Sequence, residues 1–485
     1  MKNYYLWFRE GSKINQIICA LLINMPVFVY GASIGWMSPM TLLLQSDKSP
    51  KVPPLTDYEV SCMAAVAYMV SFPANFLMAA LGDRIGRKNT IFILSGAGFT
   101  CWAIKLLSLE FAAFVSARAL VGVLMAGSYV TCPLYTKEIS EDSVRGMLGS
   151  LIIVFHTTGN LFVYVIGDFL SYRTILWICL TIPAVHMVLF MMMPESPSFL
   201  VKTGDMEEAA RCLAWLRCRK EDDIVIQDEL IRIKNEQIKD QESNKYVFRA
   251  IFTDKLIFRA FKIALVMSLA REFCGAIPVL NFAGAIFSDA SKGTGLVFSP
   301  NQQAMVLGAV QVIGSIFGFS LVERAGRKPL FIVTALISGL SMCALASWFI
   351  LRDFEVCDVY QVAWLPIAAL CLCIFCDSSG LQPVSVIIFG EMFSYKYRGT
   401  AIAASNSSGS LSAFFQMLVY KPIVNAIGFY VTFYCFGAVC LLTAVYVILV
   451  MPETKQRGLE EIYEDLKTKK EKKLEADQTN IEDKI

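Results

Sequence analysis

Two charged residues lie in the middle of an apolar stretch of this sequence. Arg271 and Glu272 are adjacent within the run 259–286. Ionisable side chains inside a membrane are costly and are usually functional. A carboxylate accepts hydrogen bonds from hydroxyl groups and a guanidinium donates them, so the pair could bind a hydroxylated or charged solute. Because neighbours in a helix point about 100° apart, we expect Arg271 and Glu272 not to face each other, and one of them to pair with another helix.

Other polar side chains in apolar runs are candidates for the same solute site. Their amide, hydroxyl and imidazole groups can supply the paired donors and acceptors that the hydroxyl groups of a polar solute require. For each of them alone, a hydrogen bond between helices is an equally good explanation. These candidates are His156, Thr157, Asn160, Gln311 and Gln382.

The elements that must position these residues are transmembrane helices. Hydrophobic residues make up 56% of the 485 residues and charged residues only 17%, whereas soluble domains carry about 25% charged residues. A helix needs about 20 apolar residues to span the hydrocarbon. Twelve runs of this kind are present, at 14–37, 57–80, 90–109, 111–134, 147–168, 171–193, 259–286, 301–322, 329–351, 361–390, 398–420 and 427–451.

Three short charged motifs occur twice, in the same order. The separation between the two copies is nearly the same for all three, which predicts two copies of one unit with a site between them. The pairs are Gly82–Lys88 with Glu323–Lys328, Glu138 and Arg145 with Glu391 and Arg398, and Pro194–Ser196 with Pro452–Thr454.

The domain organisation follows from the runs and the duplication. Residues 1–193 and 259–451 are predicted to be the two six-helix halves, 194–258 a linker with surface helices, and 452–485 a tail. Lysine and arginine are concentrated in the short loops on one side, and such loops are usually cytoplasmic. Both termini and the linker are therefore predicted to be cytoplasmic, in a multi-pass protein of the cell membrane.

Several function classes are excluded. The basic residues are dispersed in short loops rather than gathered in one patch, so no nucleic-acid partner is predicted. The chain has 2 histidines, and no nucleophile elbow or glycine-rich phosphate loop stands out, so we predict neither enzyme activity nor a cofactor or metal ion. The predicted partners are a small-molecule solute and the lipid bilayer.

The repeated motifs resemble those of the sugar porters of the major facilitator superfamily over nearly the whole chain. The resemblance implies an all-α membrane protein with twelve transmembrane helices in two six-helix halves, which works by alternating access. It also implies a cytoplasmic gate whose charges pair across the halves when that side is closed. Alternatively, these charges are topology signals in exposed pairs, worth at most about 1 kcal/mol each. The gate residues would be Asp83, Arg87, Glu138, Arg145, Glu323, Arg327, Glu391 and Arg398.

Within this family, the segments Trp36–Pro39 and Leu213–Arg217 are similar to the insect facilitated trehalose transporters. Asn406 matches a polar position of the eleventh span and is a further solute-binding candidate. Phe282 lies where the family has an aromatic gate pair. Ser33 stands where proton-linked sugar porters have an aspartate, which favours uncoupled transport, although Glu272 is a carboxylate that can titrate.

The seventh span departs from the family pattern. Sugar porters typically have Gln-Gln-x-Ser-Gly-x-Asn there, whereas this chain has residues 271–277 in its place and keeps only Gly275. The resemblance still implies a facilitative transporter of trehalose or a hexose, in which we expect Glu272 to accept hydrogen bonds from sugar hydroxyls and Arg271 to donate hydrogen bonds or balance charge. Two alternatives stay open, a transporter of a non-sugar or charged metabolite and a sugar sensor that does not transport.

Overall fold

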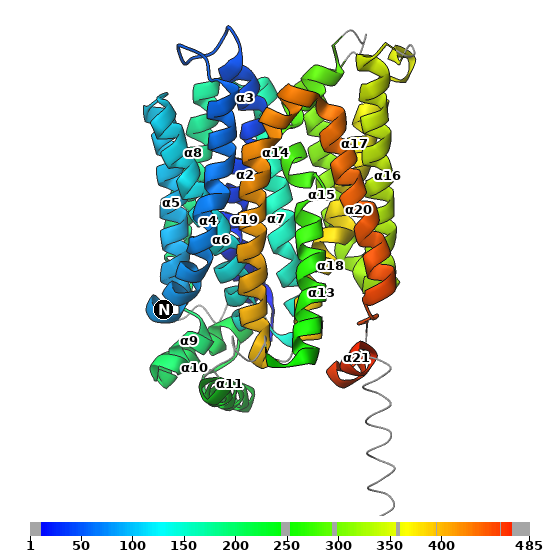
Figure 1. Cartoon of the computed structure of the whole chain (residues 1–485). Coiled ribbons are helices and arrows are strands. Elements are labelled where there is room, and N and C mark those ends of the chain that lie inside the picture. Colours follow the sequence, from blue (N-terminus) through cyan, green and yellow to red (C-terminus); the bar gives the residue numbers. More distant parts are fainter. Residues whose placement is uncertain are drawn as a thin grey trace, which may run out of the picture.

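The computed structural model describes residues 11–243, 253–292, 298–355, 359–393, 395–455 and 457–467. Within these ranges the chain forms long, roughly parallel helices packed into one bundle (Figure 1). Among the described residues, ten helical segments are long and apolar enough to cross a membrane. The remaining two predicted spans coincide with α15 (Pro300–Ala325), of 26 residues, and α19 (Tyr395–Ile427), of 33 residues.

The first half contains six spans. The first span has two single-residue interruptions and is followed by five continuous helices. Its elements are α1 (Ile14–Ile23), α2 (Met25–Gly35), α3 (Met37–Gln45), α4 (Asp57–Ile85), α5 (Arg87–Leu107), α6 (Phe111–Ile139), α7 (Asp142–Phe169) and α8 (Tyr172–Phe190).

The second half repeats this arrangement with two broken spans. Its elements are α13 (Lys255–Glu272), α14 (Ala276–Ala290), α15 (Pro300–Ala325), α16 (Arg327–Asp353), η2 (Tyr360–Val362), α17 (Leu365–Cys376), η3 (Asp377–Leu381), α18 (Gln382–Met392), α19 (Tyr395–Ile427) and α20 (Phe429–Val450).

The seventh span breaks where the candidate charged pair lies. Helix α13 ends at Glu272, and α14 begins after Gly275, whose φ of +94° is in the left-handed region. A Cβ atom on Gly275 would lie 2.6 Å from the Phe436 ring, so neither the backbone nor the packing accepts another residue without strain. The tenth span contains the π-helical turn η3, a feature that is frequent at functional sites. The two irregular segments together position the charged groups described below.

Short amphipathic helices lie at one end of the bundle, which we call the linker end (Figure 1). The Asp205 carboxylate accepts a hydrogen bond from the Glu208 N–H and caps the N-terminus of α10 (Met206–Arg217). Ala209 and Leu213 pack with Ile226 in a small apolar cluster. The helices are α9 (Pro197–Thr203), α10 (Met206–Arg217), α11 (Ile224–Ser243) and, after the last span, α21 (Leu459–Leu466).

Candidate functional site

Arg271 and Glu272 form an ion pair at the break in the seventh span. Arg271 Nη1 lies 2.8 Å from Glu272 Oε1, and Nε lies 3.3 Å from Asp377 Oδ1 of η3. The prediction that Arg271 and Glu272 do not face each other is wrong, because α13 ends at Glu272 and two long side chains can bend together at a helix end. The expected pairing with a second helix is present through Asp377.

Asp377 was not among the predicted site residues. Its side chain is 1% exposed, and its Oδ2 atom has no hydrogen-bond partner among the described residues. The Cys274 Sγ–H group donates weakly to Oδ1 over 3.9 Å. The sequence feature that could have identified Asp377 is an ionisable residue inside the apolar run 361–390. The same kind of feature identified Arg271 as a candidate.

The predicted polar residues of the fifth and eighth spans meet between the two halves. The Asn160 amide on α7 donates to Gln311 Oε1 on α15 over 3.3 Å. The hydroxyls of Thr157 and Ser315 lie 3.1 Å apart on the same two helices. Asn160 Oδ1 is buried and has no partner among the described residues. Three predicted residues therefore lie at the plane that separates the halves.

His156 occupies an aromatic pocket of the first half. Its ring stacks on Tyr30 with centroids 5.0 Å apart and contacts the edge of Tyr129 at 6.4 Å. Both ring nitrogens are without a partner among the described residues. A Cβ on Gly31 would lie 2.1 Å from the His156 carbonyl oxygen, so glycine lets α2 and α7 approach closely here. Tyr30 and Tyr129 were not predicted as site residues.

The start of α14 makes a further contact between the halves. The Asn281 amide donates to the Tyr68 hydroxyl over 3.2 Å, and Asn281 Oδ1 is buried without a partner among the described residues. The next residue, Phe282, has non-helical φ and ψ and is buried. Its ring stacks on Tyr420 of its own half at 5.3 Å. The aromatic contact exists, but whether Phe282 is a gate stays a prediction.

Gln382 and Asn406 are less directly connected to this site. Gln382 is buried at the start of α18, directly after the turn that carries Asp377. Asn406 is half-buried on α19, where its carbonyl accepts a hydrogen bond from Ser410. Within the described ranges, no hydrogen bond joins either side chain to Arg271 or Glu272. Their role in binding stays a prediction.

The three repeated motifs of the first half assemble at the linker end. Arg87 lies 3.1 Å from Glu138 and 2.9 Å from Asp83. The Glu195 carboxylate accepts hydrogen bonds from the backbone N–H groups of Arg87 (2.9 Å) and Lys88 (3.0 Å). Burial raises the pKa of Glu195, and these backbone hydrogen bonds oppose the rise. We call this set the motif cluster.

The second half contains the same motif cluster. Arg327 lies 2.6 Å from Glu391 and 3.1 Å from Glu323. Glu453 accepts from the N–H groups of Arg327 and Lys328, each over 3.1 Å. The hydroxyls of Ser196 and Thr454 donate to Glu138 and Glu391 at equivalent places. The ordered repetition in the sequence is therefore explained by one structure built twice.

The gate charges pair within halves in this structure. Arg145 contacts Asp142 of its own helix and donates to the Ser140 carbonyl over 3.0 Å. Arg398 belongs to α19, but its side chain lies outside the described residues. Pairing across the halves is expected only when the linker end is closed, so it stays a prediction.

The halves are joined at the end opposite the linker. Lys421 Nζ lies 2.6 Å from Asp57 Oδ1 and donates to Gln45 Oε1 over 3.0 Å. Asn425 donates to Asp57 Oδ2 over 3.0 Å. We call these four residues the opposite-end lock. None of them was predicted as a site residue, because Gln45 and Asp57 lie at helix ends and their contacts with Lys421 and Asn425 of α19 join residues far apart in the sequence.

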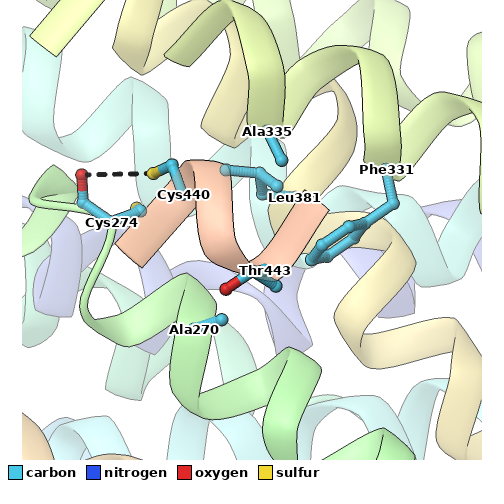
Figure 2. A pocket seen from close by; sticks show the side chains of 7 residues that line it. All are labelled: Ala270, Cys274, Phe331, Ala335, Leu381, Cys440 and Thr443. Carbon is cyan, nitrogen blue, oxygen red and sulfur yellow. Dashed lines mark hydrogen bonds between the residues drawn. The ribbon is translucent and has the colours of Figure 1, made fainter. Parts of the chain in front are cut away.

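A small cavity lies inside the second half, next to the broken span. Its volume is about 10 Å³, room for about one water molecule. Cys440 and Cys274 contact each other across one side of it, where the thiol lies 4.0 Å from a backbone carbonyl (Figure 2). This cavity is too small for a sugar. Its lining residues are Ala270, Cys274, Phe331, Ala335, Leu381, Cys440 and Thr443.

Residues 19–466 match the family model described as sugar (and other) transporter. This chain belongs to the sugar transporter family. It is a multi-pass membrane transporter of that family, as the repeated motifs predict.

Similar curated proteins of this transporter family come from insects. The chain is 26% identical to the facilitated trehalose transporter Tret1 of Aedes aegypti over 92% of this chain and 54% of that protein. It is also 26% identical to Tret1 of Culex quinquefasciatus, over 92% of this chain and 85% of that protein. The chain thus spans about half the length of the first relative and most of the second.

Solved structures of similar fold include the xylose transporter XylE from E. coli. Its inward open conformation has a TM-score of 0.73 and 18% identity, covering 92% of this chain and 99% of XylE. XylE bound to 6-bromo-6-deoxy-D-glucose gives a TM-score of 0.71, also with 18% identity, over 95% of this chain and 100% of that chain. These likenesses confirm the twelve-helix fold of the major facilitator superfamily for this transporter.

Proposed function

We propose that this chain moves a sugar through a membrane by facilitated diffusion, exposing one site alternately to the two sides. The observation that carries the proposal is the set of polar contacts between the halves, beside the Arg271–Glu272 pair at the broken seventh span. The membership of the sugar transporter family supports it. The facilitated trehalose transport named for the insect relatives favours a disaccharide or hexose without proton coupling.

The solute would bind in the plane between the halves. Glu272 accepts hydrogen bonds from solute hydroxyls, and Arg271 donates hydrogen bonds and balances charge. The aromatic faces around His156 offer an apolar surface for a sugar ring. The other proposed ligands are Thr157, Asn160, Gln311, Gln382 and Asn406.

The linker end would be the cytoplasmic end, because the short loops rich in lysine and arginine lie there. Both termini would then be cytoplasmic, in a protein of the cell membrane. The opposite-end lock would close the external side, so the conformation described here would be the inward-facing one. Opening the external side would require this lock to separate and the gate charges of the linker end to approach one another.

The first test is uptake of radiolabelled trehalose, glucose and fructose by proteoliposomes that contain the purified chain. The measurements are made at two pH values, with and without an imposed proton gradient. We expect saturable uptake of at least one sugar at a rate that ignores the gradient. Accumulation above the external concentration when a gradient is imposed would contradict facilitated diffusion. Absence of all sugar uptake by folded protein would contradict sugar transport.

Replacing Arg145 with alanine should lower transport more than it lowers the amount of protein in the membrane. Arg145 is 37% exposed and has only local partners here, so its loss costs the observed conformation little. If it pairs across the halves when the linker end closes, an exposed pair worth about 1 kcal/mol changes the cycling rate about fivefold. Arg211→Ala is the matched control, since Arg211 pairs locally on α10. Equal losses of transport and abundance would mean that Arg145 serves folding only.

A further inference from the structure

The charges at the broken seventh span do not balance. Two carboxylates, Glu272 and Asp377, share the single guanidinium of Arg271. The side chains of all three are mostly buried, with exposures of 14%, 1% and 19%. A buried charge without a partner is costly, so a site with one excess negative charge favours any positive group that can reach it.

Two further buried cations of the spans, both in the first half, are engaged elsewhere. Arg118 donates to the carbonyls of Met63 and Ser33, over 2.9 and 3.0 Å. Lys105 lies between the rings of Trp36 and Trp102, at 4.1 and 4.2 Å from their centroids. Neither forms an ion pair with a carboxylate within the described ranges. The excess negative charge of the second half is therefore not matched by direct contact.

The free oxygens at this site are hydrogen-bond acceptors. Asp377 Oδ2, Asn160 Oδ1 and Asn281 Oδ1 are buried without partners among the described residues. The amide N–H groups of both asparagines are already used, in bonds that cross between the halves. Asn160 Oδ1 lies against α2 of its own half, where a Cβ on Gly35 would be 2.9 Å from it. Asp377 Oδ2 and Asn281 Oδ1 are therefore the acceptors left for a solute, and groups that donate hydrogen bonds fit best.

Glu272 lies at this plane. A Cβ atom on Gly409 of α19 would be 3.6 Å from the Glu272 carboxylate. The next residue on α19, Ser410, contacts Ser71 and Asn75 of the first half at 3.3 and 3.4 Å. The Glu272 carboxylate is thus one residue away from a contact between the halves, and its side chain is still 14% exposed.

We propose that the preferred solute carries an ammonium group, which binds at Glu272 and Asp377 while its hydroxyls bind the neighbouring acceptors. The substrate class is then an aminated sugar or a similar amino polyol, and anionic sugars are excluded. This inference rests on the proposed transport function. It explains why the amide-rich seventh span typical of sugar porters is replaced by a charged one, since amides cannot neutralise a cation.

The test is competition against uptake of the radiolabelled sugar that the carrier transports, in proteoliposomes at pH 6.5. The competitors are two pairs of nearly equal shape, glucose with glucosamine and trehalose with 2-amino-2-deoxytrehalose. N-acetylglucosamine tests the loss of the positive charge, because its nitrogen is uncharged. Glucuronate tests a negative charge in its place. We expect the aminated member of a pair to inhibit at about tenfold lower concentration than its neutral partner, because a hydrogen bond to a charged group is worth more than a neutral one. Acetylation should remove this advantage, and glucuronate should not compete.

Variants locate the effect. Asp377→Asn removes the excess charge and should abolish the preference for the amine, measured as the ratio of the inhibitory concentrations of glucose and glucosamine in that variant. Glu272→Gln is the second variant, should the first fail to fold. Asp289→Asn is the matched control, because Asp289 also pairs with an arginine, Arg352 at 2.8 Å, but lies at the far end of α14. The ratio of the inhibitory concentrations of two competitors, measured on one protein preparation, does not depend on the amount of protein.

Three outcomes are decisive. Loss of the amine preference in Asp377→Asn or Glu272→Gln, with the preference kept in Asp289→Asn, supports the inference. Equal inhibition by glucose and glucosamine in the wild type overturns it and leaves sugar transport intact. Absence of uptake of every sugar would instead be a failure of the proposed function.

Discussion

Replacing Arg271 with methionine is expected to abolish solute transport. Arg271 is the only cation in contact with Glu272 and Asp377 among the described residues. Without it, two carboxylates are left inside the membrane without their shared cation, and breaking such a buried pair costs about 3–5 kcal/mol. The protein should reach the membrane in smaller amounts and transport nothing measurable per molecule. Uptake and surface abundance are measured on the same cells.

Two further variants separate charge from shape at this position. The double variant Arg271→Met with Asp377→Asn leaves one carboxylate and should recover much of the abundance. Arg271→Lys keeps the charge but loses the fixed fork that reaches both carboxylates, so it should give intermediate transport. If Arg271→Met transported at more than half the wild-type rate, the ion pairs of Arg271 with Glu272 and Asp377 would have no role in the site.

Replacing Lys421 with methionine should shift the protein away from the conformation described here. Lys421 is 11% exposed and contacts both Asp57 and Gln45 of the other half. Because Asp57 is 51% exposed, we assign the pair about 1 kcal/mol, which changes the ratio of the two conformations about fivefold. Fluorophores in the loop 46–56 and at the end of α16 should report a longer distance between the halves at this end.

The control for this variant is Lys292→Met. Lys292 carries the same charge near the same end but pairs with Asp289 of its own half, at 2.6 Å. The exchanged pair Asp57→Lys with Lys421→Asp should restore the wild-type distance distribution. An unchanged distribution in Lys421→Met would show that the lock does not hold this end closed.

The sequence predicted the bundle and its duplication well. The twelve apolar runs coincide with the spans formed by the described residues, and the repeated motifs assemble into equivalent clusters. These features could be predicted because a transmembrane helix is recognised from a local run of apolar residues. A motif that occurs twice, in the same order as its neighbours, also indicates a duplicated unit. The partners Glu195 and Glu453 also belong to the repeats, although their hydrogen bonds to backbone N–H groups were not predicted.

The details of the site were predicted less well. Arg271 and Asp377 are 106 residues apart, and η3 packs mainly on α15 and α16, so only the tertiary structure brings Asp377 within reach of the long Arg271 side chain. The direct contact between Arg271 and Glu272 depends on the helix ending there, which the left-handed Gly275 permits and the hydrophobic pattern does not reveal. The opposite-end lock joins loop-proximal residues of different halves. Contacts of this kind need the tertiary structure.

The two motif clusters also bear on how the protein is made. The first cluster uses only residues up to Ser196, and the second only residues from Glu323 onward. A ribosome delivers the first half before the second, and domains generally fold as units in that order. The first half can therefore complete its own cluster during synthesis, as soon as its sixth helix has entered the membrane. Two separately expressed halves should accordingly reassemble into one working carrier.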